Sequence, residues 1–188
     1  MALSESKFPI LMQSIAALTT AITLLLLLQF RHTGAGWALT AAISVGTTSY
    51  HFLMRLLVGF VVPKMTNYRF DYRNPWFQPR KWETAFYRKL KVRQWKRYLP
   101  TYAPSQFSLK SNSLLRVIQN MCGAEVVHEI IMVLSFLPLL LVPVFGEFPV
   151  FFLTSLLSAL FDSIFVIAQR FNRPRLVHIY EKQEKKRP

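Results

Sequence analysis

Long apolar runs separated by polar segments dominate the chain. Four of them are long enough to cross a bilayer, at about residues 8–30, 37–62, 117–144 and 150–171. A helix needs roughly 20 apolar residues to span the hydrocarbon core. The pattern therefore predicts an all-α membrane protein with four transmembrane helices, in a single integral membrane domain over residues 1–188.

The first apolar run could be mistaken for a signal peptide. Its length exceeds the roughly 7–15 apolar residues of a usual signal sequence. No small-residue cleavage site stands out before Arg31. We expect this run to be retained as the first transmembrane helix.

The longest polar segment, residues 64–116, is rich in basic and aromatic side chains. Within it, residues 81–99 have the pattern of an amphipathic helix that lies at a membrane interface. The expected apolar anchors are Trp82, Phe86, Leu90, Trp95 and Leu99. The basic residues expected to reach the lipid headgroups are Arg88, Lys89, Arg93, Lys96 and Arg97.

The net charge of +14 could indicate a nucleic-acid partner. However, nearly all of the 23 Lys and Arg residues lie before, between or after the apolar runs, as in a membrane protein with a basic cytoplasmic face. We therefore expect membrane lipids and no nucleic acid as partners. The same rule places both termini and the long polar segment in the cytoplasm.

Ionisable side chains interrupt the second, third and fourth apolar runs. Six of them are candidates for a shared site: His51, Arg55, Glu125, His128, Glu129 and Asp162. Charged groups in a spanning helix are costly and usually face a bundle interior or a wet cavity. Counted at about 1.5 Å per residue, residues of all three runs lie at similar depth from the basic side, which predicts one polar pocket open to the cytoplasm.

An acid, an imidazole and a guanidinium in apolar surroundings suit general acid–base chemistry. We expect His128 to accept the proton of an attacking hydroxyl and Glu125 to orient its ring. Arg55 and His51 are expected to stabilise developing negative charge.

Two other interpretations of these residues remain open. Buried charges can pair only to satisfy each other, Arg55 with Asp162 and His51 with Glu129. A metal site would use oxygen and nitrogen ligands from four residues: His51, Glu125, His128 and Asp162. No HExxH or comparable spacing occurs, so no metal is expected.

The basic side chains beside the apolar runs also have two interpretations. They can hold anionic lipid without specificity, or they can bind the phosphates of an acyl donor. The expected phosphate-binding residues are Arg93, Lys96, Arg170, Arg173 and Arg175. At the end of the fourth run, Asn172 is expected to cap the helix and Pro174 to stop it.

Three segments together resemble the glycosyl-4,4'-diaponeurosporenoate acyltransferase family: FYRKLKVRQWKRYLP, AEVVHE and IAQRFNRPRL. The similarity covers roughly residues 70–177. Members of that family are small integral membrane proteins of carotenoid pigment biosynthesis. The resemblance implies transfer of a fatty acyl group to a sugar hydroxyl of a glycosylated isoprenoid, in a bacterial cell membrane.

The sequence therefore predicts a membrane-embedded acyltransferase that uses a cytosolic donor, with acyl-CoA as co-substrate and no other cofactor. Its acceptor would be a glycosylated isoprenoid or another glycolipid. The competing prediction is a non-catalytic lipid-binding or assembly subunit, in which the polar cluster only fixes helix packing. An open pocket at His128 would favour the enzyme, and closed ion pairs would favour the subunit.

Overall fold

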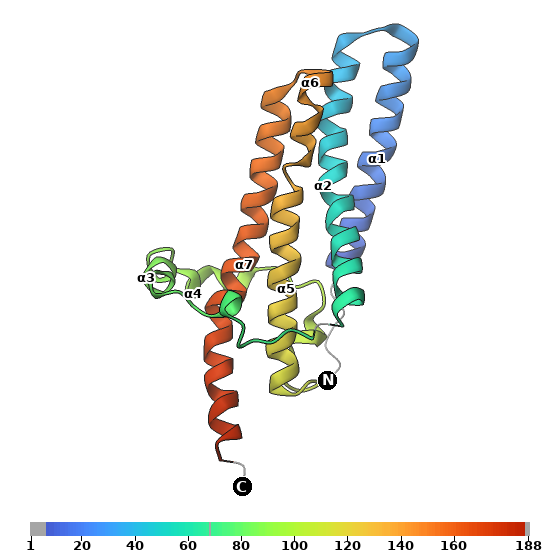
Figure 1. Ribbon diagram of the computed structural model, residues 1–188. Helices are drawn as coiled ribbons and strands as arrows, with labels where there is room; N and C mark the ends of the chain where they lie inside the picture. Colours follow the sequence, from blue (N-terminus) through green and yellow to red (C-terminus); the bar gives the residue numbers. More distant parts are fainter. Residues whose placement is uncertain (1–6, 68, 187–188) are drawn as a thin grey trace. The chain divides into compact units, whose positions relative to one another are not determined.

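The computed structural model describes residues 7–67 and 69–186, and four of its helical segments are long and apolar enough to cross a membrane. They are α1 (Phe8–Thr33), α2 (Gly36–Thr66), α5 with α6 (Leu114–Leu134 and Val142–Phe145) and α7 (Phe148–Glu184) (Figure 1). No strand occurs among the described residues. The predicted all-α membrane protein with four transmembrane helices is confirmed.

The polar segment between α2 and α5 folds into short helices. They are η1 (Pro75–Phe77), α3 (Lys81–Lys89), α4 (Val92–Trp95), η2 (Lys96–Tyr98) and η3 (Pro104–Phe107). The amphipathic helix expected over residues 81–99 is present but shorter, because the chain turns after α3. Lys91 has φ 53°, in the left-handed region, where an α-helix of L-residues cannot continue.

Prolines affect the helices differently from the prediction. α7 continues through Pro174, so the expectation that Asn172 caps the fourth helix and Pro174 stops it is wrong. α2 likewise contains Pro63. An interior proline removes one backbone hydrogen bond and costs about 3 kcal/mol, so other contacts must hold these turns. In α7 they include the buried contacts of Arg173 described below.

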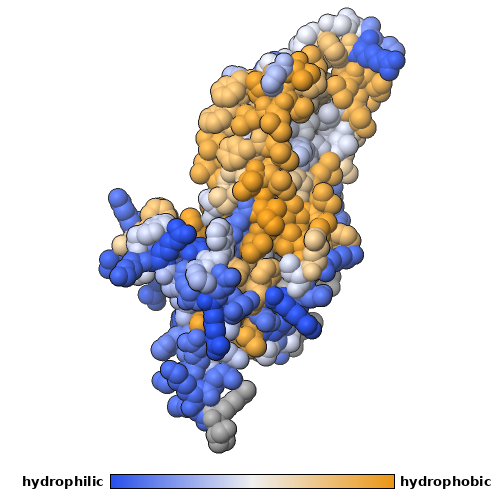
Figure 2. Space-filling view, in the orientation of Figure 1, coloured by the Kyte–Doolittle hydropathy of each residue, from blue (hydrophilic) through white to orange (hydrophobic). Residues whose placement is uncertain are grey.

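The chain forms two compact units. The apolar unit comprises Lys7–Phe60 and Ile130–Asp162, and the polar unit comprises residues 61–129 and 163–186. In Figure 2, orange hydrophobic surface covers most of the helices of the apolar unit, and blue hydrophilic surface covers much of the polar unit. Leucines such as Leu25 and Leu157 are exposed on the apolar unit, as expected of a surface that faces lipid.

Polar contacts join the helices inside the apolar unit. The hydroxyls of Thr20 and Ser49 lie 2.7 Å apart and connect α1 to α2. The Tyr50 hydroxyl donates a hydrogen bond of 2.7 Å to the Leu134 carbonyl and connects α2 to the end of α5. Water is absent from the hydrocarbon core, so helices in lipid rely on packing and on such hydrogen bonds.

The strongest of these contacts is a buried ion pair between α2 and α7. Arg55 Nη2 lies 2.5 Å from Asp162 Oδ2, and Asp162 is fully buried. The same guanidinium nitrogen donates to Ser158 Oγ at 2.8 Å, and Ser158 Oγ lies 2.8 Å from Ser135 Oγ. The pairing of Arg55 with Asp162 that the sequence allowed is therefore formed.

Replacing Asp162 by Asn should lower the free energy of unfolding by about 3–5 kcal/mol, because Arg55 would keep its charge in a buried place. Thermal unfolding of the purified protein in detergent micelles measures this change. Glu147→Gln is the control, because the hydrogen bond of Glu147 with Thr40 is exposed. Equal unfolding temperatures for the two variants would contradict a stabilising buried pair.

Candidate active site and its charge cluster

Helix α5 carries three polar residues that the sequence analysis identified as candidates, and all three lie in the part of α5 that belongs to the polar unit. Glu125 shares a helical face with His128 and Glu129, which follow it by three and four positions. Their surroundings differ, because Glu125 is fully buried whereas His128 and Glu129 are half-buried.

Glu125 is bound by two arginines of α7. Arg170 Nη1 donates to Glu125 Oε1 at 2.6 Å, and Arg173 Nη1 donates to Glu125 Oε2. Arg170 also reaches Glu83 of α3, with 2.7 Å between Nη2 and Oε1. Two carboxylates thus balance two guanidiniums, and this charge cluster of Glu83, Glu125, Arg170 and Arg173 joins α3, α5 and α7.

The charge cluster also holds the segment around η1. Arg170 Nη1 donates to the Trp76 carbonyl at 3.0 Å, and Arg173 Nη2 donates to the Phe77 carbonyl at 2.6 Å. The Arg173 guanidinium carbon lies 5.1 Å from the centre of the Phe77 ring, in a cation–π contact. Because both oxygens of Glu125 bind arginines, the contacts indicate a structural role for Glu125 and do not support the expected orientation of His128.

His128 is positioned by an aromatic ring. It stacks on Phe165 of α7 with 4.6 Å between ring centroids and 8° between the ring planes. The neighbouring Glu129 accepts a hydrogen bond of 2.8 Å from Trp76 Nε1. Stacking fixes the plane of the imidazole while the half-buried position leaves part of it exposed, which is what a base that meets a substrate requires.

The residues expected to form one pocket belong to different units. The apolar unit contains His51, Arg55 and Asp162, and the polar unit contains Glu125, His128 and Glu129. His51 is buried, and neither of its ring nitrogens has a hydrogen-bond partner among the described residues, so the alternative that pairs His51 with Glu129 finds no support. A catalytic pocket built from all six residues stays a prediction.

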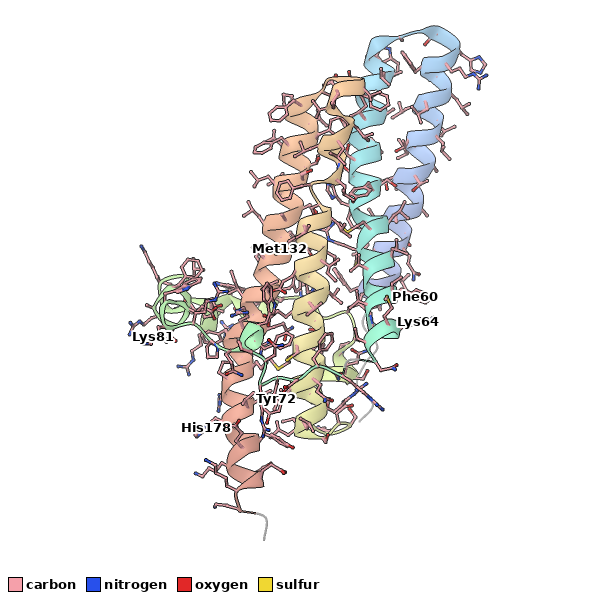
Figure 3. The ribbon with its side chains drawn as sticks, viewed as in Figure 1. Phe60, Lys64, Tyr72, Lys81, Met132 and His178 are labelled. Carbon is pink, nitrogen blue, oxygen red and sulfur yellow. The ribbon has the colours of Figure 1, made fainter. Side chains whose placement is uncertain are left out.

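Metal ligands and cavities also bear on the site. No group of three or more His, Cys, Asp or Glu side chains could hold a metal ion within residues 7–67 and 69–186. A cavity of about 140 Å³ in the polar unit is lined by Tyr72, Phe77, Arg173 and His178, among others, and His128 is not part of its lining. Figure 3 labels Tyr72 and His178.

Three of the expected phosphate-binding residues form a separate basic cluster: Arg93, Lys96 and Arg175. The Lys96 ammonium donates to Asn172 Oδ1 and lies 4.6 Å from the centre of the Phe171 ring. Burial, and then the positive charges of Arg175 and Arg93, lower the pKa of Lys96. No ion pair with a carboxylate is formed by the three within the described part of the chain. Cations gathered without a counter-ion are typical of an anion-binding site.

Sequence reasoning missed Glu83, which links α3 to Arg170. Its signal is that it is the only acidic residue among residues 81–99, a segment rich in Lys and Arg. The Tyr87 hydroxyl donates to Glu83 Oε2 at 3.1 Å. Burial and the negative charge of Glu83 raise the pKa of Tyr87 to about 12, so the hydroxyl stays protonated and keeps donating.

Replacing Glu125 by Gln should lower the free energy of unfolding by about 3–5 kcal/mol, because the buried Arg173 would lose its carboxylate. Glu83→Gln should cost less, because Arg170 would still bind Glu125. Chemical denaturation in detergent micelles measures both changes, with Glu181→Gln on the exposed end of α7 as the control. An unchanged stability of Glu125→Gln would show that the charge cluster does not hold these helices together.

Residues 73–182 match the glycosyl-4,4'-diaponeurosporenoate acyltransferase family. The match includes the charge cluster, His128 and the basic cluster, and it excludes His51 and Arg55. No curated protein and no solved structure matches the chain. Since the match covers more than half of the sequence, the chain belongs to the glycosyl-4,4'-diaponeurosporenoate acyltransferase family.

Proposed function

We propose that the protein transfers a fatty acyl group from acyl-CoA in the cytosol to a hydroxyl of a glycosylated isoprenoid or another membrane glycolipid. Membership of an acyltransferase family of carotenoid biosynthesis supports the reaction class. Four apolar helices fit an acceptor that resides in the membrane. The observation that carries the assignment of the base is the half-buried His128, held against Phe165 inside the family match.

The reaction needs a group that moves one proton. The acceptor hydroxyl attacks the thioester carbonyl, so that a C–O bond forms and the C–S bond breaks. In this proposal His128 takes the proton from the hydroxyl and returns it to the departing sulfur of coenzyme A. An imidazole with part of its ring exposed can do both.

The basic cluster is the proposed site for the donor phosphates. Arg93, Lys96 and Arg175 supply donors that match phosphate oxygens. Along α7, residues 171–175 next to this cluster follow Phe165 by roughly 9–15 Å. Acyl-CoA could reach both places, because a long flexible arm separates its phosphates from its thioester.

The orientation in the membrane is part of the same proposal. The basic segment and both termini are assigned to the cytoplasmic side of a bacterial cell membrane by the excess of Lys and Arg. This orientation would give the basic cluster direct access to a cytosolic donor.

Replacing His128 by Ala should lower the turnover of labelled acyl-CoA with a lipid extract by about 10²–10⁴-fold, the usual contribution of a general base. Purified protein in lipid nanodiscs is the material for the assay. His178→Ala is the matched control, because His178 is an exposed histidine on α7 of the same unit. Equal turnover in His128→Ala and the wild type would remove His128 from the mechanism.

Replacing Lys96 by Gln should weaken the binding of coenzyme A by about tenfold or more, because one charge-assisted hydrogen bond is lost. Titration calorimetry on the protein in detergent measures the affinity. Lys110→Gln, which removes an exposed loop lysine, is the control. The same affinity in the wild type and Lys96→Gln would exclude Lys96 from the donor site.

The lowered pKa of Lys96 gives the free protein a pH dependence of known sign. In the pH window just below 10.5, the unfolded chain still binds a proton that folded Lys96 has lost, so the stability rises with pH there. Lys96→Gln should remove this rise, and unfolding at a series of pH values tests it. Persistence of the full rise in the variant would assign it to another group.

A non-catalytic lipid-binding or assembly subunit is the competing function. The closed ion pairs of Arg55 with Asp162 and of Glu125 with Arg173 favour it, because they give these charges a purely structural use. In that case His128→Ala changes thermal stability and there is no acyl transfer to lose. Loss of turnover at an unchanged unfolding temperature supports the enzyme instead.

A further inference from the structure

Helix α3 buries Glu83 and Tyr87 and leaves its apolar residues Trp82 and Phe86 exposed. Glu83 and Tyr87 are 3% and 7% exposed, and they face the rest of the polar unit through Arg170 and Phe171. Trp82 is 57% exposed. On a soluble protein the apolar face of such a helix is usually covered, whereas here Trp82 and Phe86 are exposed.

The exposed apolar residues form a strip along α3 and its C-terminal cap. Trp82, Phe86 and Leu90 follow each other at intervals of four residues and therefore share one side of the helix. The rings of Trp82 and Phe86 pack edge to face with 5.7 Å between their centroids. A strip of this kind, rimmed by charged groups, marks an interaction surface.

The charge around this strip has one sign. The eight basic residues from Arg80 to Arg97 are Arg80, Lys81, Arg88, Lys89, Lys91, Arg93, Lys96 and Arg97. All except Lys96 are exposed. The single acidic residue in this stretch, Glu83, is buried and paired with Arg170. The surface is therefore complementary to an anionic partner.

Contacts with α7 place α3 beside the point where the apolar sequence of α7 ends. Glu83 pairs with Arg170, and the ring of Tyr87 packs on Phe171 with 6.2 Å between centroids. The apolar residues of α7 give way to polar ones at Gln169. Figure 1 shows α3 and α4 beside this part of α7, and Figure 3 labels Lys81 on the same projection. Tryptophan, lysine and arginine concentrate at this level in membrane proteins.

We propose that the strip of Trp82, Phe86 and Leu90 docks on the bilayer surface and that anionic lipid headgroups hold it there. The aromatic rings would enter the boundary between headgroups and acyl chains, and the exposed Arg88 and Lys89 would bind lipid phosphates. This proposal is independent of acyl transfer, since the basic cluster proposed for the donor is centred on Lys96 and packs on Phe171.

A fluorophore placed on either side of α3 tests the docking. Phe86→Cys puts the label on the strip, and Thr84→Cys puts it two residues away on the opposite exposed side. The full chain retains Cys122, which is fully buried, so unlabelled wild type checks that only the new thiol reacts. The proteins are studied in nanodiscs of phosphatidylcholine, with or without phosphatidylglycerol, that contain a nitroxide-labelled lipid.

We expect the nitroxide to quench the label at position 86 about twofold more than the label at position 84 in anionic nanodiscs. The difference should shrink in neutral nanodiscs and with added salt, because salt screens the attraction to the headgroups. Arg88→Gln together with Lys89→Gln should reduce quenching at position 86 in anionic nanodiscs only. Unfolding temperatures confirm that each variant is folded.

Equal quenching at the two positions overturns the proposal, and so does quenching at position 86 that ignores lipid charge. Shielding of the label only at high protein concentration would also overturn it, and would assign the strip to contact between two copies of the chain.

Discussion

The pairing of Glu125 with Arg173 is the constraint on which the polar unit depends. Both side chains are almost completely buried, and either one alone would leave an uncompensated charge that costs several kcal/mol. Helices α5 and α7 must therefore meet in the register that brings these residues together. Arg170 extends the same network to Glu83, so the position of α3 follows from the position of α7.

The five basic residues that the sequence grouped together have two different uses. Arg170 and Arg173 are neutralised by carboxylates and bound to backbone carbonyls, so their charges hold the fold. Burial and the nearby charges of Arg175 and Arg93 lower the pKa of Lys96, so a bound anion would stabilise its charged form. Charge that is already balanced stabilises the structure, whereas charge that is not balanced is available to a ligand.

The bilayer explains which parts of the fold could be read from the sequence. A spanning segment must satisfy its own backbone, so apolar runs of sufficient length predict helices directly. The continuation of α7 through Pro174 could not be predicted in this way, because it depends on contacts of Arg173 with residues 48 and 96 positions away in the chain. The binding of Glu125 by Arg170 and Arg173 could not be predicted for the same reason, because these arginines are 45 and 48 positions away in the chain.

The stacking of His128 on Phe165 bears on its proposed role as a general base. A general base has to change its protonation during the reaction, and a carboxylate locked between two guanidiniums cannot follow that change. Glu125 is locked in this way, and Asp162 is bound to Arg55. Stacking on the uncharged ring of Phe165 fixes the plane of the imidazole. The ion pairs of Glu125 with Arg170 and Arg173 keep α5 and α7 in register around this ring.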